Sequence, residues 1–498
     1  MKEKIKEHIS KHSIIYGAIL IFFCIAGYGM ADINLTLSDE MFNFANIFKL
    51  YNGVELYSEN NIIVTPLYFY LVNFIFKLFG ANMLVFKIIN VIIFEIIMVI
   101  IIKMLKKLGV PVVRSVVYIL LLIFPFLRDL FVCGTNYNTL AMLFWLLGMN
   151  FIIKKDKLEV RAIEQGIISA LVFATKQNIG IYYLIGLTLF TLYNYKKELK
   201  IAIKKLVGIY TVFAIITAGW CLILALNGQF KDFINYCFLG IGEFSKNNTS
   251  MLWGEMLYYI IPISIIIGVI IWVKKYKISK DNKIYKTIIF LGCFMIAALP
   301  IGYPIFNSYH VKLSIVPSVI LLIYLGNCIM NLISDLLKHK AIFIVIVIYI
   351  AILIILNFVQ LGLFMGTIFN SNYELEHNDG FYGTRLAEGY KNALGEISTF
   401  IKEKEAEGKD VIIFSGEANL YEVPLGRHKK DYDLPYLGNW GYKGEERIIN
   451  EIKNFKKTYV IMREEDYIGQ ESERVKDVIK EEYESMGDFA GYKLYYKE

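Results

Sequence analysis

The chain has 498 residues, of which 56% are hydrophobic and only 19% are charged, and its mean hydropathy is +0.50. Soluble domains typically hold about 45–50% apolar and about 25% charged residues, so this composition excludes a disordered protein and argues against a soluble enzyme. Long apolar runs with few charges instead predict a polytopic α-helical membrane protein.

Charge divides the chain into two predicted parts. Residues 1–366 carry 33 Lys and Arg against 18 Asp and Glu, whereas residues 367–498 carry 19 against 27. The basic excess lies in short loops between apolar runs, so it reports membrane topology rather than nucleic-acid binding. We predict a multi-span membrane domain over 1–366, with its first outer loop at 31–82, and an extracytoplasmic soluble α/β domain over 367–498.

The first apolar run, 14–30, follows the basic sequence MKEKIKEHISKHS. No small-residue cleavage site is evident, which predicts a retained anchor with a cytoplasmic N-terminus. Later basic clusters are expected on the same side by the positive-inside rule. They lie at 103–114, 154–161, 196–205, 274–286 and 338–340.

Because the basic clusters are expected on one side of the membrane, the chain must cross it an even number of times between two successive clusters. Of the segments 62–79 and 83–102 only one can cross, and we place the proline-containing, aromatic 62–79 at the outer interface. Two short spans are expected within 166–193, with Lys176 at their outer turn. Other spans are expected at 113–132, 138–153, 205–226, 257–273, 287–302, 311–333 and 341–366. The total is about eleven, and this odd number places the C-terminal domain outside the cell membrane.

The C-terminal part alternates short apolar strands with amphipathic segments. Strands are predicted at Asp410–Phe414, Thr458–Met462 and 492–496, and helices at 390–405, 445–454 and 471–485. The six cysteines are scattered without a CxxC pair, which excludes a cysteine zinc site or a disulfide framework.

This topology gathers polar residues at the outer face. Five separate segments contribute Asp39-Glu40, Arg128-Asp129, Lys176, the loop 227–255 and the segment 303–310. A plain anchor or scaffold protein would not need such a gathering. We interpret it as a site, because charged groups at membrane depth are costly and often functional.

Each candidate residue also has a purely structural interpretation. Asp39 could cap a helix beginning at Met41, and Arg128-Asp129 could be a local ion pair. Lys176 could be a turn lysine that reaches the interface, and His310 beside Tyr309 could belong to an aromatic belt. Glu243 could be a solvated loop acid rather than part of an acceptor entrance. The carboxylates Asp39, Glu40 and Glu59 could hold a divalent metal ion, although no spacing demands one.

The order of several short motifs resembles the GT-C membrane glycosyltransferases, in the branch of the aminoarabinose transferases and the protein O-mannosyltransferases (glycosyltransferase family 39). Asp39, a short helix, Gly53 and a Pro-Leu-Tyr segment ending in Leu-Phe-Gly resemble its first outer loop. Further similar segments are 136–147, the Ala-Thr-Lys-Gln of 174–177, Tyr309-His310 before Pro317, and 419–421 with Thr458–Met462 in the tail. The chain departs from this pattern at Val64-Thr65-Pro66-Leu67, which lacks the family's Lys, and at Asn138, where a second Asp is common.

The resemblance implies a polyprenyl-phosphate-dependent transferase of the hexosyl or pentosyl class. Asp39 would be the general base, and Glu40 would orient it or bind a metal. Lys176, Arg128 and His310 would stabilise the leaving phosphate, and one in-line attack would invert the anomeric carbon. Asp129, Asn138, Tyr309 and Glu243 would support these groups or the acceptor, which could be a glycan, a lipid or a protein.

A transporter or flippase of lipid-linked saccharides is the alternative from another class. Intramembrane Lys, Asp and His could line a polar path, and transporters often have two related halves. No similarity between halves is evident here, and most charges gather at one face. Both features favour the transferase.

Overall fold

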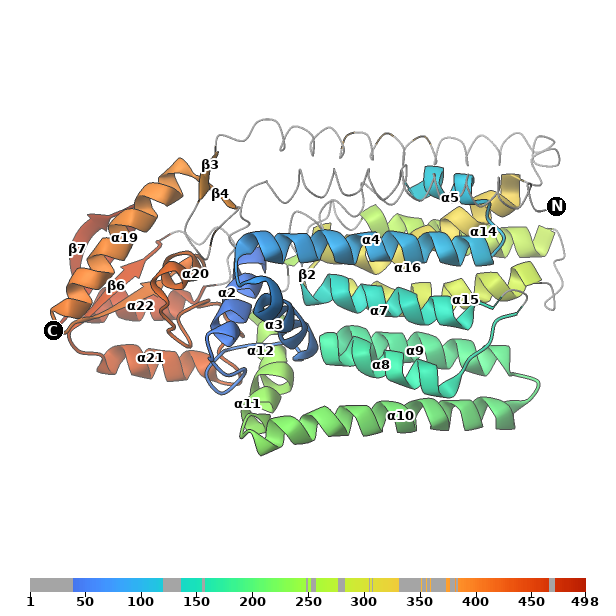
Figure 1. Cartoon of the computed structure of the whole chain (residues 1–498), viewed down its shortest axis with the longest axis horizontal. Helices are drawn as coiled ribbons and strands as arrows, with labels where there is room; N and C mark the ends of the chain where they lie inside the picture. The colour runs from blue at the N-terminus through green and yellow to red at the C-terminus, as the bar shows by residue number, and fades with distance from the viewer. Residues whose placement is uncertain are drawn as a thin grey trace.

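The computed structural model describes residues 39–119, 136–154, 157–247, 250–251, 257–275, 283–303, 305–306, 308–330, 351, 355, 359, 373–376, 381, 384–464 and 471–498. Long helices run side by side through most of the molecule, and a small α/β unit lies at one end (Figure 1). The expected span at 14–30, most of 113–132 and almost all of 341–366 lie outside the described residues.

Apolar sequence runs form the long helices. They are α4 (Met83–Lys107), α7 (Tyr137–Ile152), α8 (Ala162–Thr175), α9 (Gln177–Asn194), α10 (Leu199–Leu226), α14 (Ile260–Lys275), α15 (Lys283–Ala298) and α16 (Ser308–Met330), with the short α5 (Val112–Tyr118) after α4. Within the described residues, four helical stretches are long and apolar enough to cross a membrane: Met83–Lys107, Leu199–Leu226, Lys283–Gly302 and Tyr309–Cys328. Shorter apolar helices accompany them, which supports a multi-pass membrane protein, while the total of about eleven spans stays a prediction.

The helices differ in how they are buried. The apolar window of α16 is 89% buried and that of α10 only 11%, so α16 lies in the bundle interior and α10 exposes its side chains, as a lipid-facing helix does. An aromatic cluster marks the centre of the packing. The ring of Trp145 on α7 lies 5.4 Å from Tyr183 on α9 and 6.0 Å from Phe294 on α15, centroid to centroid.

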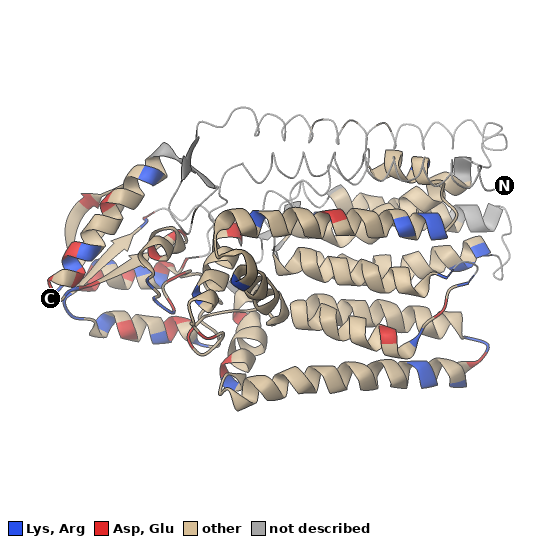
Figure 2. Ribbon diagram, in the orientation of Figure 1, with Lys and Arg blue, Asp and Glu red and all other residues tan. Residues whose placement is uncertain are grey.

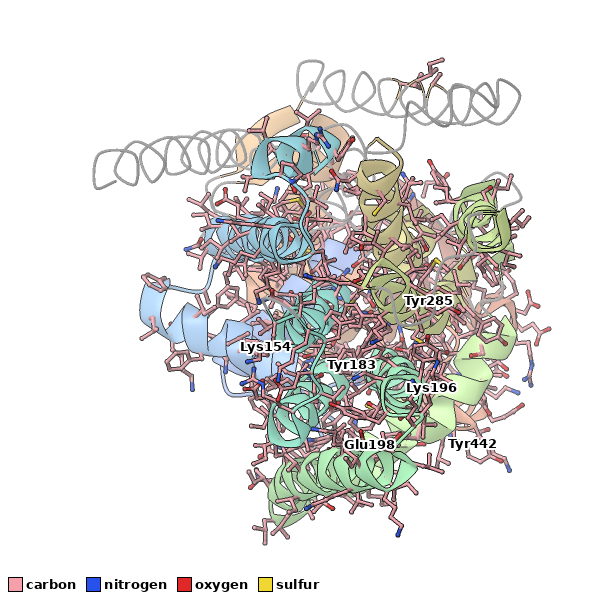
Figure 3. The ribbon with its side chains drawn as sticks, turned by 90° about the vertical axis from the view of Figure 1, so that its right-hand side faces the viewer. Lys154, Tyr183, Lys196, Glu198, Tyr285 and Tyr442 are labelled. Atoms are coloured by element: carbon pink, nitrogen blue, oxygen red, sulfur yellow. The ribbon has the colours of Figure 1, made fainter. Side chains whose placement is uncertain are left out.

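The basic clusters meet at the end of the helices that is remote from the α/β unit (Figure 2). The charges of Lys154 and Arg161, in the cluster 154–161, act on the ammonium of Lys107 in the cluster 103–114. Figure 3 looks onto this end and labels Lys154 and Lys196 there. The expectation that the clusters 103–114, 154–161 and 196–205 share one side is therefore confirmed, and the assignment of that side to the cytoplasm stays a prediction.

Short helices occupy the opposite end of the bundle. They are α2 (Asp39–Tyr51), α3 (Leu67–Phe79), α11 (Phe230–Ile234), the π-helix η2 (Asn235–Leu239) and α12 (Gly240–Asn247). α2 and α12 run across the direction of the long helices (Figure 1). α3 exposes Phe74 and Phe79, at 60% and 71%, which suits the expected interfacial position of 62–79.

The remaining short elements near this end come from later segments. They are η3 (Leu257–Tyr259), the 3-10 helix η4 (Leu299–Gly302), and the parallel two-residue strands β1 (Ser250–Met251) and β2 (Ile305–Phe306). Towards the α/β unit, β3 (Tyr373–Glu376) and β4 (Thr384–Ala387) form an antiparallel pair.

The C-terminal unit is a four-stranded sheet in the order β5-β6-β8-β7. Its strands are β5 (Asp410–Phe414), β6 (Thr458–Met462), β7 (Glu484–Phe489) and β8 (Tyr492–Lys497), and its helices are α19 (Glu388–Ala406), α20 (Ala418–Glu422), η6 (Val423–Leu425), α21 (Gly444–Asn454) and α22 (Glu473–Glu482). β5 and β6 are parallel, and β8 is antiparallel to both β6 and β7. The predicted strands and helices are confirmed, except that the helix expected over 471–485 ends at Glu482 and the unpredicted β7 follows.

Alternation of side chains along β5 gives the sheet two packed faces. Ile412 and Phe414 join the cluster of α21 and α22 residues, including Ile448 and Val475. Val411 and Ile413 belong instead to the large core that continues into the helical bundle. Because successive strand residues point to opposite faces, this apolar sequence buries both faces of the sheet and attaches one of them to the bundle.

The contact between α8 and α9 depends on Gly180. A β-carbon there would lie 2.4 Å from Cα and 2.7 Å from the backbone nitrogen of Phe173. We expect Gly180→Ala to lower the free energy of unfolding by about 1–3 kcal/mol, because backbone atoms have no room to yield. Thermal unfolding in detergent measures this change. Gly219→Ala on α10 is the matched control, since nothing lies within 4 Å of its new β-carbon. Equal effects of the two changes would contradict the packing argument.

Candidate functional site

Lys176 occupies a one-residue turn between α8 and α9. Its backbone is extended, with φ −154° and ψ 116°, and it caps the end of one helix and the start of the next. Its N–H donates to the Val172 carbonyl at 2.9 Å, and its carbonyl accepts from the Gly180 N–H at 3.0 Å. The apolar runs on both sides form the two helices of a tight hairpin, so the lysine is fixed at its tip. The position of Lys176 between two short helices, expected from the sequence, is confirmed.

The Lys176 ammonium is held by the beginning of α7. Nζ donates to Asn138 Oδ1 at 2.5 Å and lies 5.0 Å from the centre of the Tyr137 ring. Asn138 is 1% exposed. A neutral amide oxygen and an aromatic face therefore hold the ammonium in this place.

The first turn of α16 joins the same place. The Tyr309 hydroxyl donates to Asn136 Oδ1 at 2.5 Å, and this same oxygen accepts N–H groups as the N-cap of α7. The His310 ring lies 5.2 Å from the Tyr309 ring and is close enough to Lys176 to sense its charge. Helices α7 and α16 and the α8–α9 turn therefore bring Asn138, Lys176, Tyr309 and His310 together.

Helix α2 contributes Glu40. Its side chain is 4% exposed, and its carboxylate acts electrostatically on the buried Tyr68 hydroxyl of α3. The Tyr68 ring in turn makes an edge contact with Tyr137, 6.2 Å between centroids. The cluster therefore runs from Glu40 through two tyrosines to Lys176. Asp39 begins α2, but its side chain lies outside the described part of the structure, as do Arg128 and Asp129.

The loop after α2, residues 52–66, is attached to the hairpin. Gln177 Nε2 donates to the carbonyls of Ile63 at 2.9 Å and Cys237 at 3.0 Å. Thr65 Oγ1 donates to the Phe173 carbonyl at 2.7 Å. The Thr65 hydroxyl thus ties the loop to the hairpin that carries Lys176.

The other side of α2 and this loop is held by the C-terminal unit. Lys49 Nζ on α2 donates to Asp433 Oδ2 at 2.6 Å and to Asn419 Oδ1 at 2.9 Å. His428 Nε2 lies 2.5 Å from the Glu59 carbonyl oxygen, and Lys430 Nζ donates to the Ser58 carbonyl at 2.6 Å. We call residues 428–433 the clasp segment. The loop 52–66 thus contacts the hairpin through one set of bonds and the clasp segment through another.

The pKa values of two buried carboxyl groups, one in the clasp segment and one close to it in the sequence, are shifted in opposite directions. Burial opposes the ionisation of Asp433, but Lys49 and His428 hold the pKa of its carboxyl below its usual range. Burial raises the pKa of the Glu422 carboxyl to about 7, although Arg427, 3.4 Å away, opposes the shift. Asp433 is therefore a buried anion with a partner, whereas Glu422 favours its neutral form in the folded protein.

Two predicted residues lie apart from Lys176. Glu243 on α12 accepts the Lys443 backbone N–H through both oxygens, at 3.1 and 3.0 Å, so it contacts the C-terminal unit. Glu59 Oε2 accepts the Glu55 N–H at 2.8 Å. Among the residues that the structure describes, no group of three or more His, Cys, Asp and Glu side chains is arranged to hold a metal ion.

Sequence reasoning missed Lys49, Asn136 and the clasp segment. Lys49 was recognisable in one respect, because it is a charged residue in the apolar stretch MFNFANIFKLY. In the structure it is only 3% exposed. Nothing in the sequence pairs it with Asp433, 384 residues later. Asn136 offered a helix-cap signal, but its bond to Tyr309 depends on the packing of α7 against α16.

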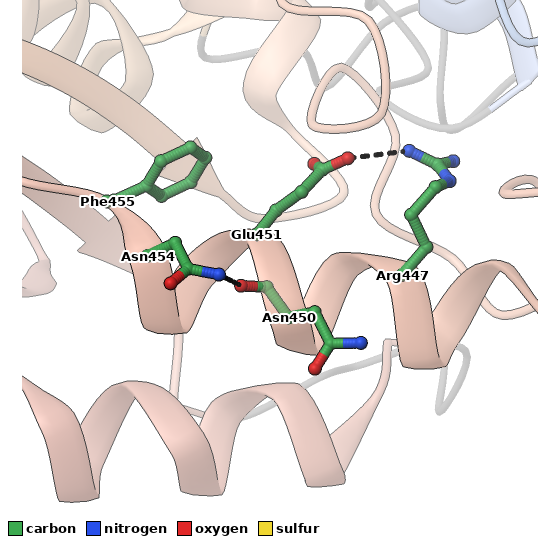
Figure 4. A pocket seen from close by; sticks show the side chains of 5 residues that line it. All are labelled: Arg447, Asn450, Glu451, Asn454 and Phe455. Carbon is green, nitrogen blue, oxygen red and sulfur yellow. Dashed lines mark hydrogen bonds and ion pairs between the residues drawn. The ribbon is translucent and has the colours of Figure 1, made fainter.

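A separate hollow of about 580 Å³ lies along α21 (Figure 4). Its lining is Arg447, Asn450, Glu451, Asn454 and Phe455. Arg447 pairs with Glu451 at 3.0 Å and Asn454 donates to the Asn450 carbonyl at 2.7 Å. The lining thus comes from one helix end with polar groups that bond locally, and it shares no residue with the Lys176 cluster.

Comparison with solved structures shows the fold. Over 98% of both chains, the structure is similar to ArnT of Cupriavidus metallidurans, an aminoarabinose transferase, bound to undecaprenyl phosphate (TM-score 0.57, 10% identity) and in its apo state (0.54, 11%). It is also similar to the oligosaccharyltransferase AglB of Archaeoglobus fulgidus, in complex with an inhibitory peptide and a dolichol-phosphate (TM-score 0.51, 11% identity, 98% of this chain and 74% of that one). The sequence matches no protein-family model and no curated protein. The expected GT-C-like fold is confirmed.

Glu422 gives a pH-dependent prediction. Its pKa is about 7 in the folded protein against 4.5 for a free carboxyl, so the unfolded chain releases a proton that the folded protein keeps. The free energy of unfolding therefore falls as the pH rises from about 4.5 to about 7. We expect Glu422→Gln to have no effect at pH 4.5 and to raise that energy at pH 8 by roughly 2–3 kcal/mol.

Thermal unfolding of the full chain at the two pH values measures this difference. Glu403→Gln, at an exposed position on α19, is the control and should change neither value. A stabilisation by Glu422→Gln of equal size at both pH values would show that the ionisation of Glu422 is not the cause.

Proposed function

We propose that the chain is an integral membrane glycosyltransferase, which moves a sugar from a polyprenyl-phosphate donor to a hydroxyl acceptor at the outer face of the membrane. The shared fold supports the class, since the similar proteins are glycosyltransferases solved with undecaprenyl phosphate or a dolichol-phosphate. Membrane helices ending at a cluster of polar groups suit a donor whose lipid lies in the bilayer while its sugar reaches water.

The observation that carries this proposal is the position of Lys176. Its ammonium is fixed at the tip of a hairpin by Asn138 and Tyr137, with His310 nearby. Breaking the bond between the sugar and the lipid phosphate leaves negative charge on the phosphate. A preorganised cation at that place stabilises the leaving group more than it stabilises the ground state. We assign Lys176 this role, with His310 and Arg128 as additional donors.

The acceptor hydroxyl requires a base on the opposite side of the sugar. We assign that role to Asp39, at the beginning of α2, with Glu40 beside it to orient Asp39 or hold a divalent ion. The acceptor oxygen bonds to the anomeric carbon, the bond from that carbon to the phosphate oxygen breaks, and the acceptor proton passes to Asp39. One such displacement inverts the anomeric centre.

The remaining residues support these groups in the proposal. Asn138 holds the Lys176 ammonium, and Tyr309 fixes the start of α7 through Asn136. Asp129 and Glu243 are assigned to the acceptor side. The topology follows the charge distribution, with the N-terminus and the basic helix ends cytoplasmic and the C-terminal unit outside the cell membrane.

Asp39→Asn tests the proposed base. Purified chain is incubated with a panel of radiolabelled polyprenyl-phosphate monosaccharides and an extract of envelope acceptors, and sugar transfer or hydrolysis is measured. We expect turnover by the wild type and a loss of about 10²–10⁴-fold in kcat for Asp39→Asn, because the amide cannot take the proton. Equal turnover would remove Asp39 as the base. Movement of intact lipid between leaflets without sugar release would instead support a transporter.

Lys176→Met tests the phosphate contact. We expect kcat/KM for the donor to fall by about 10²–10³-fold, because the cation stabilises the departing phosphate. Lys196→Met is the matched control, since the Lys196 ammonium also lies over a tyrosine ring, 4.2 Å from the centre of Tyr193, but at the opposite end of the bundle. Similar losses in the two variants would contradict the assignment of Lys176 to the donor phosphate.

A further inference from the structure

The C-terminal unit is bonded to the same helix that carries Glu40. Glu40 and Lys49 are nine residues apart on α2, about 13 Å along the axis and on nearly opposite sides of the helix. Glu40 lies beside Tyr68, in the chain of contacts that leads to Lys176. Lys49 reaches the other way, to Asp433 and Asn419. α2 is therefore a bridge between the candidate site and the C-terminal unit.

The far end of this bridge is a buried ion pair. Lys49 and Asp433 are 3% and 8% exposed, with Nζ 2.6 Å from Oδ2. Asn419 accepts from the same ammonium and donates its own amide to the Asp433 carbonyl at 2.8 Å. His428 Nδ1 lies 2.9 Å from Asp433 Oδ2. Each of these side chains is thus held in place by another member of the same group.

Stability alone does not account for such a pair. Desolvation of two charges offsets most of their attraction, and apolar residues of the same volume often stabilise as well. A buried charge pair with directed hydrogen bonds does favour one arrangement of the two elements over others. Three further contacts repeat the attachment along the clasp segment: His428 to the Glu59 carbonyl, Lys430 to the Ser58 carbonyl, and Asn61 Nδ2 to Asp431 Oδ1 at 2.7 Å.

We propose that Lys49 and Asp433 are positioning residues, through which the C-terminal unit fixes the place of α2, and with it Glu40, relative to Lys176. This inference rests on the proposed transferase function. The distance between the acceptor side on α2 and the phosphate side on the hairpin would be set from outside the helical bundle. A misplacement of reacting groups by about 1 Å can cost on the order of a hundredfold in rate, so the pair would act on turnover rather than on donor binding.

The test compares Asp433→Asn, Lys49→Arg and the double variant Lys49→Met with Asp433→Asn in the full chain, reconstituted in lipid nanodiscs. Amide hydrogen exchange of residues 40–51 reports the attachment of α2 without any need for activity. We expect Asp433→Asn to speed that exchange by about tenfold or more, with β5 and β6 still protected. We expect kcat to fall by about 10–100-fold with the donor KM within about twofold.

The double variant separates positioning from stability. The double variant leaves no buried unpaired charge, so we expect its melting temperature to return to nearly the wild-type value while its kcat stays low. Lys49→Arg keeps the charge and should retain more turnover than the double variant. Arg474→Ala, which removes an exposed ion pair on α22, is the control and should change neither measurement.

Three outcomes would overturn the inference. Recovery of kcat together with the melting temperature in the double variant would make the pair structural only. Unchanged exchange of α2 in Asp433→Asn would show that the pair does not hold the helix. Altered exchange with no sugar transfer by the wild type would mean that the pair holds α2 but that the proposed function, and with it the catalytic role, is wrong.

Discussion

A lysine ammonium at the tip of an apolar hairpin is the constraint around which the site is built. A cation at membrane depth is costly, and here an amide oxygen and a tyrosine ring contact it. These contacts require that α7, which supplies Asn138 and Tyr137, be held in register with the α8–α9 turn, so the packing of three helices is tied to one charge. Asn136 extends the requirement to α16 through Tyr309.

Elements outside the long helices are bonded to the same site. The hairpin bonds to the loop 52–66 through Gln177 and Thr65, and this loop and α2 bond to the clasp segment. The core of the bundle continues into one face of the C-terminal sheet. The two predicted parts of the chain are therefore in continuous contact at the end where the polar residues gather, whereas the basic helix ends lie at the other (Figure 2). The proposed glycosyltransferase requires such an arrangement, because the lipid of its donor lies in the bilayer while the sugar reaches water.

Much of this arrangement follows from local sequence patterns. Apolar runs and basic loops predicted the helices and their common end, and the apolar strands Asp410–Phe414 and Thr458–Met462 stood out by composition. Lys176 was identifiable because a charge between two apolar runs is rare. β7 was missed because Glu484–Phe489 is polar, glycine-containing and mostly exposed, so no apolar pattern marks the strand that pairs with β8. The bond between Lys49 and Asp433 could not be predicted, since long-range pairing leaves no periodic signal in a single sequence. The first anchor, Arg128, Asp129 and the total number of spans stay predictions.

The central claim is that Lys176 binds the phosphate of a polyprenyl-phosphate lipid. The most direct measurement is an experimental structure of the full chain in nanodiscs with undecaprenyl phosphate, the lipid bound to the similar ArnT. The account predicts density for the phosphate within hydrogen-bonding distance of Lys176 Nζ, about 2.7–3.2 Å, with the lipid tail leaving between the helices. A phosphate bound at another end or face of the bundle, away from Lys176, would contradict it.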